Sequence, residues 1–203
     1  FFLEIFMGSG RLSQSLKSKL ESAGRHDVQV IGFDLLQGRS GDVLNNDTYQ
    51  RIMSLINCGR CLGVWLAPPC SSWSTSRRFD EHTHAPPLRS RDHVMGLPSL
   101  DRHNRRQVQV ANALMQRTSD FFISCILNRV PVAVENPAKS LIWQTAQFRH
   151  MASLPGVLAA RLDFCQYGEP YQKGTRLLSW GFPPSIASMA KTCGGRGGRC
   201  SRT

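Results

Sequence analysis

The chain has 203 residues, with 25 Lys and Arg against 14 Asp and Glu, which gives a formal net charge of +11 at pH 7. This length supports one sizeable core, and a content of 41% hydrophobic and 19% charged residues excludes a disordered acidic chain or a collagen-like repeat. The excess positive charge favours an anionic partner, either nucleic acid or an acidic membrane surface.

Seven cysteines at irregular spacing do not match the disulfide framework of a secreted miniprotein, so we expect a reducing, intracellular compartment. No apolar run approaches the roughly 18 residues that a membrane span needs, and the first residues do not resemble a signal peptide. We therefore expect no membrane partner. The chain starts inside an apolar run and ends in a basic, glycine-rich stretch, so we expect a fragment of a longer protein.

The first part of the chain alternates strands with amphipathic helices. Three short apolar runs are typical of buried strands: residues 1–7, 28–33 and 62–67. Between them, apolar residues at helical spacing predict one helix that ends at Gly24 and a second that Asp47 caps. The strands end at residues of unusual chemistry: Gly8-Ser9-Gly10, Asp34 and Pro68-Pro69-Cys70.

The second part begins with residues 71–102, which show no periodicity and are rich in Ser, Arg, His and Pro. Long segments of this kind in compact domains are usually functional or disordered. Helical spacing then predicts a long helix over residues 108–126 and a short one over 141–151. Three further strands are predicted: residues 131–134, which end at Glu135-Asn136-Pro137, and residues 158–164 and 176–180. The order predicts an α/β fold with a mainly parallel sheet, in which ligands bind at the carboxyl ends of the strands.

The glycines of Gly8-Ser9-Gly10 allow close approach of the backbone to a ligand, or serve the geometry of the turn alone. No Gly-Lys-Ser/Thr follows them, which disfavours a phosphate loop. Asp34 stands where nucleoside-binding folds place an acid for ribose hydroxyls, and a solvated strand-end aspartate is the alternative. Asp42 either contacts an adenine amino group or caps the turn that follows it.

Two prolines hold Cys70 at a defined place at the edge of the sheet, as a thiol nucleophile requires, although a small buried cysteine fits the same pattern. Glu135 follows another buried strand beside the same cleft. A protonated carboxyl group there can donate to a ring nitrogen, and a helix-capping turn is the alternative.

In combination these segments resemble the cytosine-C5 DNA methyltransferases. Four segments carry the resemblance in order: Phe6 to Gly10 (motif I), Pro68-Pro69-Cys70 with Ser71 to Ser74 (motif IV), Glu135-Asn136-Pro137 (motif VI) and Tyr167 to Leu177 (motif VIII). The resemblance covers residues 1 to about 181. It implies a Rossmann-like class I S-adenosylmethionine-dependent methyltransferase fold, a mainly parallel sheet with helices on both faces. Only one helix separates Asp34 from the Pro-Pro-Cys strand, so one strand of the family's sheet is absent or reduced to Asp42-Val43.

The resemblance also implies the reaction and its residues. S-adenosylmethionine is the implied cofactor, and the implied substrate is a cytosine flipped out of double-stranded DNA. The residues implied in catalysis are Cys70, Glu135, Asn136 and Lys173. Those implied in cofactor binding are Phe6, Gly8, Ser9, Gly10, Asp34, Asp42 and Pro68. Those implied in nucleic-acid binding are Ser72, Arg77, Arg78, Arg89, Arg91, Thr175 and Arg176.

The chain departs from the family in motif VIII, where Gln-x-Arg-x-Arg is replaced by Tyr171, Lys173 and Thr175. Lys does not reproduce the bidentate geometry of Arg. The chain also stops before the family's target-recognition region and motifs IX and X. Two alternatives therefore stay open: a non-catalytic nucleic-acid-binding module with a degenerate methyltransferase fold, and an RNA cytosine methyltransferase. The inferred substrate implies the nucleus as location if the source is eukaryotic.

We expect a methyltransferase-like domain over residues 1–187 and a flexible, basic Gly- and Cys-containing tail over 188–203. Residues 77–106 carry a net charge of +3 and residues 188–203 one of +4, so most of the excess charge lies in the two least structured segments. This placement favours nucleic acid over a membrane. A zinc site that joins Cys58 and Cys61 to Cys193 and Cys200 is an alternative, but the second spacing is unlike a zinc knuckle and we predict no metal ligands.

Overall fold

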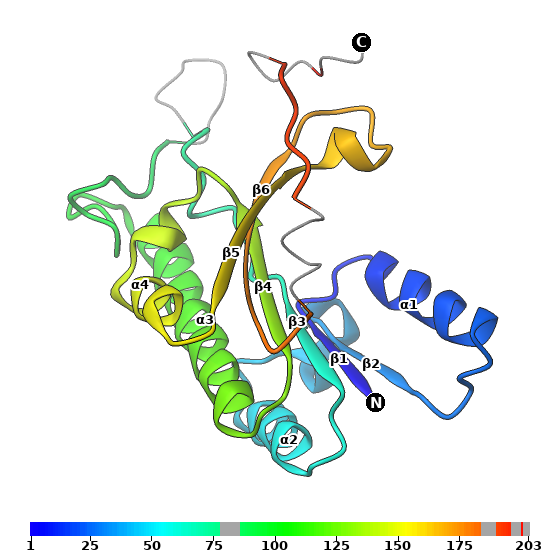
Figure 1. Cartoon of the computed structure of the whole chain (residues 1–203). Coiled ribbons are helices and arrows are strands. Elements are labelled where there is room, and N and C mark those ends of the chain that lie inside the picture. Colours follow the sequence, from blue (N-terminus) through cyan, green and yellow to red (C-terminus); the bar gives the residue numbers. More distant parts are fainter. Residues whose placement is uncertain (78–85, 184–189, 196–199, 201–203) are drawn as a thin grey trace.

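The computed structural model describes residues 1–77, 86–183, 190–195 and 200 (Figure 1). Its centre is a six-stranded sheet: β1 (Phe2–Ile5), β2 (Val30–Phe33), β3 (Gly63–Leu66), β4 (Val132–Pro137), β5 (Leu158–Asp163) and β6 (Gly174–Trp180). The strand order is β2-β1-β3-β4-β6-β5. Strands β1 to β4 run parallel, whereas β6 is antiparallel to both of its neighbours. The predicted α/β fold with a mostly parallel sheet is confirmed.

The helices lie on both faces of the sheet: α1 (Arg11–Ser22), α2 (Asn46–Asn57), α3 (Arg102–Leu127) and α4 (Ala146–Ser153), with 3-10 helices η1 (Leu35–Gly41), η2 (Leu141–Gln144) and η3 (Phe164–Tyr167). Leu3 and Ile5 of β1 join the core that α2, α3 and α4 cover. Because side chains alternate along a strand, Glu4 points to the opposite face. There the backbone N of Ser13 in α1 donates to Glu4 Oε2 at 2.8 Å. No helix in the described part of the chain is both long and apolar enough to cross a membrane.

The carboxyl ends of β1, β2, β3 and β4 share one edge of the sheet because these strands are parallel. Strand β1 has β2 on one side and β3 on the other, so the connections diverge at this point. In open α/β sheets, ligands bind in the crevice outside such a switch point. Ile5 pairs with both Phe33 and Leu66, so the segments that start at Phe6, Asp34 and Ala67 emerge side by side.

Strand β4 is longer than the sequence predicts. Glu135-Asn136-Pro137 was expected after the strand but belongs to it, because β6 extends the ladder and pairs Glu135 with Leu177 and Pro137 with Thr175. Proline is tolerated here because it occupies the last position of the strand, where a missing N–H matters least.

Of the two alternatives for the missing strand, the structure supports its absence, and the cap predicted for α2 is wrong. Its cap is Asn45, whose Oδ1 accepts hydrogen bonds from the backbone N of Asp47 at 2.9 Å and of Thr48 at 3.3 Å. Asp42-Val43 forms no strand, because Asp42 Oδ1 instead accepts from the backbone N of Leu44 at 2.9 Å and stabilises a turn. The turn buries Val43 in the core below it.

The described parts of residues 71–101 contain no helix or strand, as predicted, and a buried arginine holds them against α3. Arg89 is 5% exposed, and its guanidinium carbon lies 3.4 Å from the centroid of the Trp73 ring. Its donors reach five oxygen atoms: Ser72 O (3.1 Å), Ser72 Oγ (3.1 Å), Val94 O (2.8 Å), Asn112 Oδ1 (2.8 Å) and Val108 O (3.3 Å). None of these acceptors is charged, and burial lowers the pKa of Arg89 to about 10.

Replacing Arg89 should destabilise the fold strongly. Arg89→Met leaves several buried carbonyl oxygens without a hydrogen-bond donor, and we expect a loss of about 3 kcal/mol in the free energy of unfolding. Arg89→Lys should recover only part of it, because an ammonium group cannot reach acceptors on several sides. Urea denaturation measures both, with the exposed Arg91→Met as control, which should change stability by less than about 0.5 kcal/mol. Equal stability of the Arg89 and Arg91 variants would contradict this role.

Candidate active site

Cys70 follows β3 in a segment that two hydrogen bonds join to the segment after β4. The Asn136 side chain, 3% exposed, donates from Nδ2 to the carbonyl oxygen of Pro68 at 2.8 Å. The backbone N of Leu141 donates to the carbonyl oxygen of Trp73 at 3.0 Å. These bonds lie on either side of Cys70, which is half-buried, so they hold the Pro-Pro-Cys and Glu-Asn-Pro segments together.

Glu135 precedes Asn136 and therefore points to the other face of the sheet. It lines an apolar cavity of about 480 Å³ together with side chains of β3, β5, β6, η3 and the turn after η3: Trp65, Leu162, Phe164, Tyr167, Glu169 and Leu177. Burial raises the pKa of Glu135, an effect that Lys173 opposes and Glu4 reinforces. The protonated, hydrogen-bond-donating form of this carboxyl group is therefore favoured relative to an exposed glutamate.

Lys173 lies between Glu135 and a second, more polar cavity. Its Nζ is 4.8 Å from the centroid of the Phe164 ring, and its charge acts on Glu135. The second cavity measures about 510 Å³ and is lined by three segments that follow strands or precede β6: residues 74–76, 137–140 and 172–174. Cys70 lines neither cavity, so the structure ties Cys70 to Glu135 through their neighbours rather than by direct contact.

Three buried oxygen atoms near this edge have no hydrogen-bond partner within the described residues: Asn136 Oδ1, Asp163 Oδ1 and Thr175 Oγ1. Buried polar atoms without partners are costly, so each is suited to bind water or a ligand group. Asp163 is fully buried and lines the polar cavity, and Arg161 lines it as well. Asp163 was not among the predicted site residues, although an acid at the end of a predicted strand is the same signal that singled out Asp34.

The residues predicted to bind the cofactor meet at the switch point of the sheet. Phe6, Gly8 and Gly10 adopt positive φ angles of 65°, 54° and 70°, an arrangement that turns the chain back over the end of β1. The backbone N of Gly8 donates to Asp34 Oδ2 at 2.7 Å. The other oxygen, Asp34 Oδ1, accepts from the backbone N of Leu36 at 2.9 Å. The capping box of η1 adds a contact from the backbone of Gln37 to the same carboxylate, and Gly8 and Ser9 are exposed beside it.

Of two further residues predicted to bind the cofactor, Pro68 lies at the edge of the sheet where the switch point is, whereas Asp42 lies farther along the chain in a turn. Pro68 follows β3 at the same edge, and its ring is buried while its carbonyl accepts from Asn136. Asp42 lies at the far end of η1, where its carboxylate stabilises the turn before α2. Of the two readings of Asp42, the structure supports the cap.

The predicted nucleic-acid residues divide into buried and exposed groups. Ser72 is 2% exposed and is bonded to Arg89, so both side chains are occupied inside the protein and neither is available to a phosphate. The expectation for these two is therefore wrong, because tertiary contacts consume their polar atoms. Thr175 is buried beside the polar cavity.

The remaining predicted arginines lie closer to solvent. The Nε of Arg77 donates to the carbonyl oxygen of Pro86 at 2.9 Å, and Arg91 is exposed. Arg176 is half-buried, with its guanidinium carbon 5.0 Å from the centroid of the Trp143 ring. Arg78 lies outside the described residues. These groups retain surface from which a cation can reach a polyanion.

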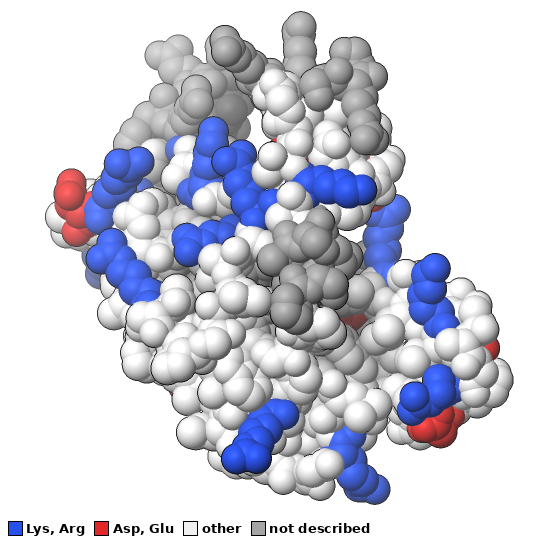
Figure 2. Space-filling model, viewed as in Figure 1, with Lys and Arg blue, Asp and Glu red and all other residues white. Residues whose placement is uncertain are grey.

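Positive charge gathers on one side of the molecule. Figure 2 shows Lys and Arg side chains concentrated over the loops at the carboxyl ends of β3 and β4, with few acidic side chains among them. Lys139, Arg161 and Lys173 line the polar cavity at this end. The polar cavity is therefore suited to an anionic ligand.

No model of a known protein family matches this chain, and neither a curated protein nor a solved structure matches it.

The raised pKa of Glu135 predicts a pH-dependent stability. The glutamates of the unfolded chain have a pKa of about 4.3, and the folded chain binds the proton of Glu135 more tightly. The contribution of Glu135 to stability is therefore present at low pH and is lost as the pH rises through the raised pKa. Glu135→Gln should remove this contribution and become progressively more stable than the wild type as pH rises.

Urea denaturation of both proteins between about pH 4 and pH 8 tests this expectation. Glu21→Gln, at an exposed position of α1, is the matched control and should follow the wild-type profile. A stability difference between wild type and Glu135→Gln that does not change with pH would show that Glu135 titrates as in the unfolded chain.

Proposed function

We propose that the chain is an S-adenosylmethionine-dependent methyltransferase domain that methylates C5 of cytosine in DNA through Cys70. The observation that carries the proposal is the hydrogen bond from Asn136 to the Pro68 carbonyl, because it joins the segments that bear Cys70 and Glu135. The motif resemblance requires these two segments to work on the same base. The elevated pKa of Glu135 supports the same assignment.

The sheet supports a class I methyltransferase fold that lacks one strand. The order β2-β1-β3-β4 is that of a doubly wound sheet whose third strand is missing. The connection from β2 to β3 contains η1 and α2 and no strand. A shortened sheet of this kind keeps the switch point between β1 and β3, which is where the cofactor would bind.

The residues at the switch point fit S-adenosylmethionine. The Asp34 carboxylate lies at the switch point, where it can accept from ribose hydroxyls, and a Cβ at Gly8 would meet nothing within 4 Å, so the turn leaves open space beside it. Phe6 and Pro68 flank this space at the ends of β1 and β3. The bound cofactor would supply an electrophilic methyl group.

The side chains of the chain account for the rest of the reaction. The Cys70 thiolate adds to C6 of the cytosine and forms a carbon–sulfur bond, which makes C5 nucleophilic. Protonated Glu135 donates to N3 and accepts from the amino group, which withdraws electrons from the ring during the attack. After C5 has gained the methyl group, a base removes the C5 proton and the carbon–sulfur bond breaks, which regenerates Cys70.

Asn136 and Lys173 act through these groups. Asn136 is a positioning residue, because its amide fixes the carbonyl of Pro68, two residues before the thiol. Lys173 limits the rise in the pKa of Glu135 and so keeps its proton exchangeable. Lys173 also lines the polar cavity with Lys139 and Arg161, which supports a phosphate of the substrate there.

Covalent trapping tests the proposal. DNA duplexes that contain 5-fluorocytosine, incubated with the chain and S-adenosylmethionine, should give an adduct stable in denaturing gels, because fluorine at C5 blocks the final elimination. Cys70→Ser should abolish the adduct, whereas Cys58→Ser, at an exposed cysteine, should form it normally. An adduct with RNA that contains 5-fluorocytosine, but not with DNA, would identify RNA as the substrate. No adduct with either polymer, together with salt-dependent binding to both, would identify a non-catalytic binding module.

Cofactor binding can be tested separately by isothermal titration calorimetry. We expect Asp34→Asn to weaken binding of S-adenosylmethionine about tenfold, or about 1.4 kcal/mol, because the neutral amide is a poorer acceptor for ribose hydroxyls. Asp27→Asn, in an exposed turn, is the control and should bind like the wild type. Wild-type protein that gives no binding heat would contradict the cofactor assignment.

A further inference from the structure

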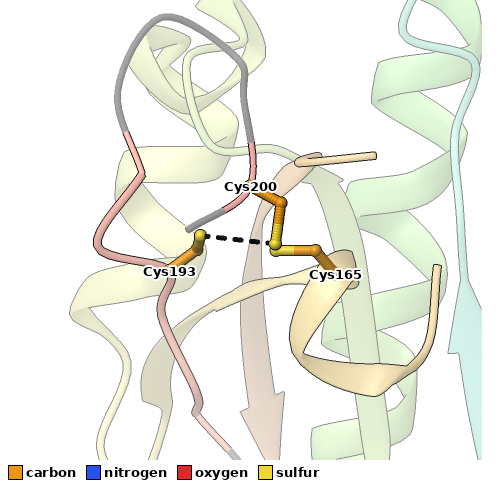
Figure 3. Close-up of side chains that lie close together, drawn as sticks. All are labelled: Cys165, Cys193 and Cys200. Carbon is orange, nitrogen blue, oxygen red and sulfur yellow. Dashed lines mark hydrogen bonds between the residues drawn. The ribbon is translucent and has the colours of Figure 1, made fainter. Parts of the chain in front are cut away.

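Three cysteine side chains converge at the end of β5, away from Cys70. Cys165 lies in η3, and Cys193 and Cys200 come from the segment that follows β6 (Figure 3). Their sulfur atoms all lie within 4.8 Å of one another. Cys165 and Cys200 are 3% and 8% exposed, so the cluster is largely shielded from solvent.

The spacing of the sulfur atoms suits a metal ion. Zinc binds thiolates at about 2.3 Å in a tetrahedron, which places two sulfur ligands about 3.8 Å apart. The Sγ atoms of Cys193 and Cys200 are 3.9 Å apart. A disulfide bond would require about 2.05 Å. The observed separation therefore matches two corners of a zinc tetrahedron.

Backbone and side-chain N–H groups are directed at two of the sulfurs. The backbone N of Gly195 donates to Cys193 Sγ at 3.3 Å, and Gln166 Nε2 donates to Cys165 Sγ at 3.7 Å. Hydrogen bonds of this kind stabilise the negative charge of a thiolate and orient metal ligands from outside. They are an observation independent of the sulfur distances.

The segment that carries Cys193 is also anchored beside the cluster. The backbone N of Cys193 donates to Asp163 Oδ2 at 2.6 Å, and the backbone N of Asp163 donates to the carbonyl oxygen of Lys191 at 2.9 Å. The described part of the predicted flexible tail is thus bonded to the end of β5. The expected alternative, a site shared with Cys58 and Cys61, is replaced by one in which Cys165 is the third thiol.

We propose that Cys165, Cys193 and Cys200 bind a structural Zn²⁺ ion as thiolates. Three soft sulfur donors within 4.8 Å of one another favour zinc over magnesium or calcium, which require oxygen ligands. One further ligand, a water molecule or another side chain, completes the coordination. The ion fixes the segment around Cys193 to η3. The proposal does not depend on the methyltransferase activity.

Metal analysis of the full chain tests the proposal. Protein expressed in zinc-supplemented medium and purified under reducing conditions should contain about one zinc ion per chain by mass spectrometry. Cys165→Ser and Cys200→Ser should each lose most of this zinc, and Cys58→Ser should keep it. Retention of zinc by Cys165→Ser together with its loss from Cys58→Ser would overturn the assignment of ligands. Metal-free wild-type protein that also fails to bind added Zn²⁺ would overturn the site itself.

A second measurement covers the case in which the cysteine variants do not fold. X-ray absorption spectroscopy of the zinc-loaded wild type should show at least three sulfur neighbours at about 2.3 Å. A shell of nitrogen and oxygen neighbours would instead show adventitious zinc. Peptide mapping of the reduced, purified protein should find all three thiols accessible to alkylation only after chelation. A disulfide between any two of them under these conditions would contradict the proposal.

Discussion

The hydrogen bond from the Asn136 amide to the Pro68 carbonyl is the constraint on which the candidate site depends. It is buried, it joins the ends of two neighbouring parallel strands, and it acts between residues far apart in the chain. It fixes the backbone before Cys70. The residues after Cys70 are held by two other contacts: the carbonyl oxygen of Trp73 accepts from Leu141, and that of Ser72 accepts from Arg89. Without the bond, Pro68 and Pro69 would still stiffen the backbone before Cys70, but nothing would orient this segment relative to the end of β4.

Arg89 shows how a segment without secondary structure can still be rigid. Within the described residues its buried charge has no acidic partner and is compensated by five neutral oxygen atoms and the face of Trp73. The acceptors come from Ser72, from Val94 and from Val108 and Asn112 of α3, so the guanidinium group joins backbone that forms no hydrogen-bond ladder in the described residues. The described residues between β3 and α3 are therefore held in a defined conformation, although they form no helix or strand.

Local patterns in the sequence predicted the strands and helices, because parallel strands buried on both faces are apolar throughout, and they placed Gly8 and Asp34 at strand ends. The failures were those that depend on distant partners. Glu135 to Pro137 were expected after the strand because the strand that pairs them, β6, comes much later in the chain. Arg89 stood among polar residues and so suggested a solvated side chain. Cys165 was missed because no short spacing links it to Cys193.

The position of β6 has a consequence for the order in which the protein assembles. Among the strands of the described residues it comes last in the sequence, yet it lies between β4 and β5 and is the strand with which β5 pairs. Until residues 174–180 have left the ribosome, one edge of β4 is open and β5 has no ladder, so Asn136 and Pro137 have no register. The half of the sheet that contains β1, β2 and β3 can form early from nearby segments, whereas the half that orients Glu135 must close last and through long-range contacts, which are slow to form.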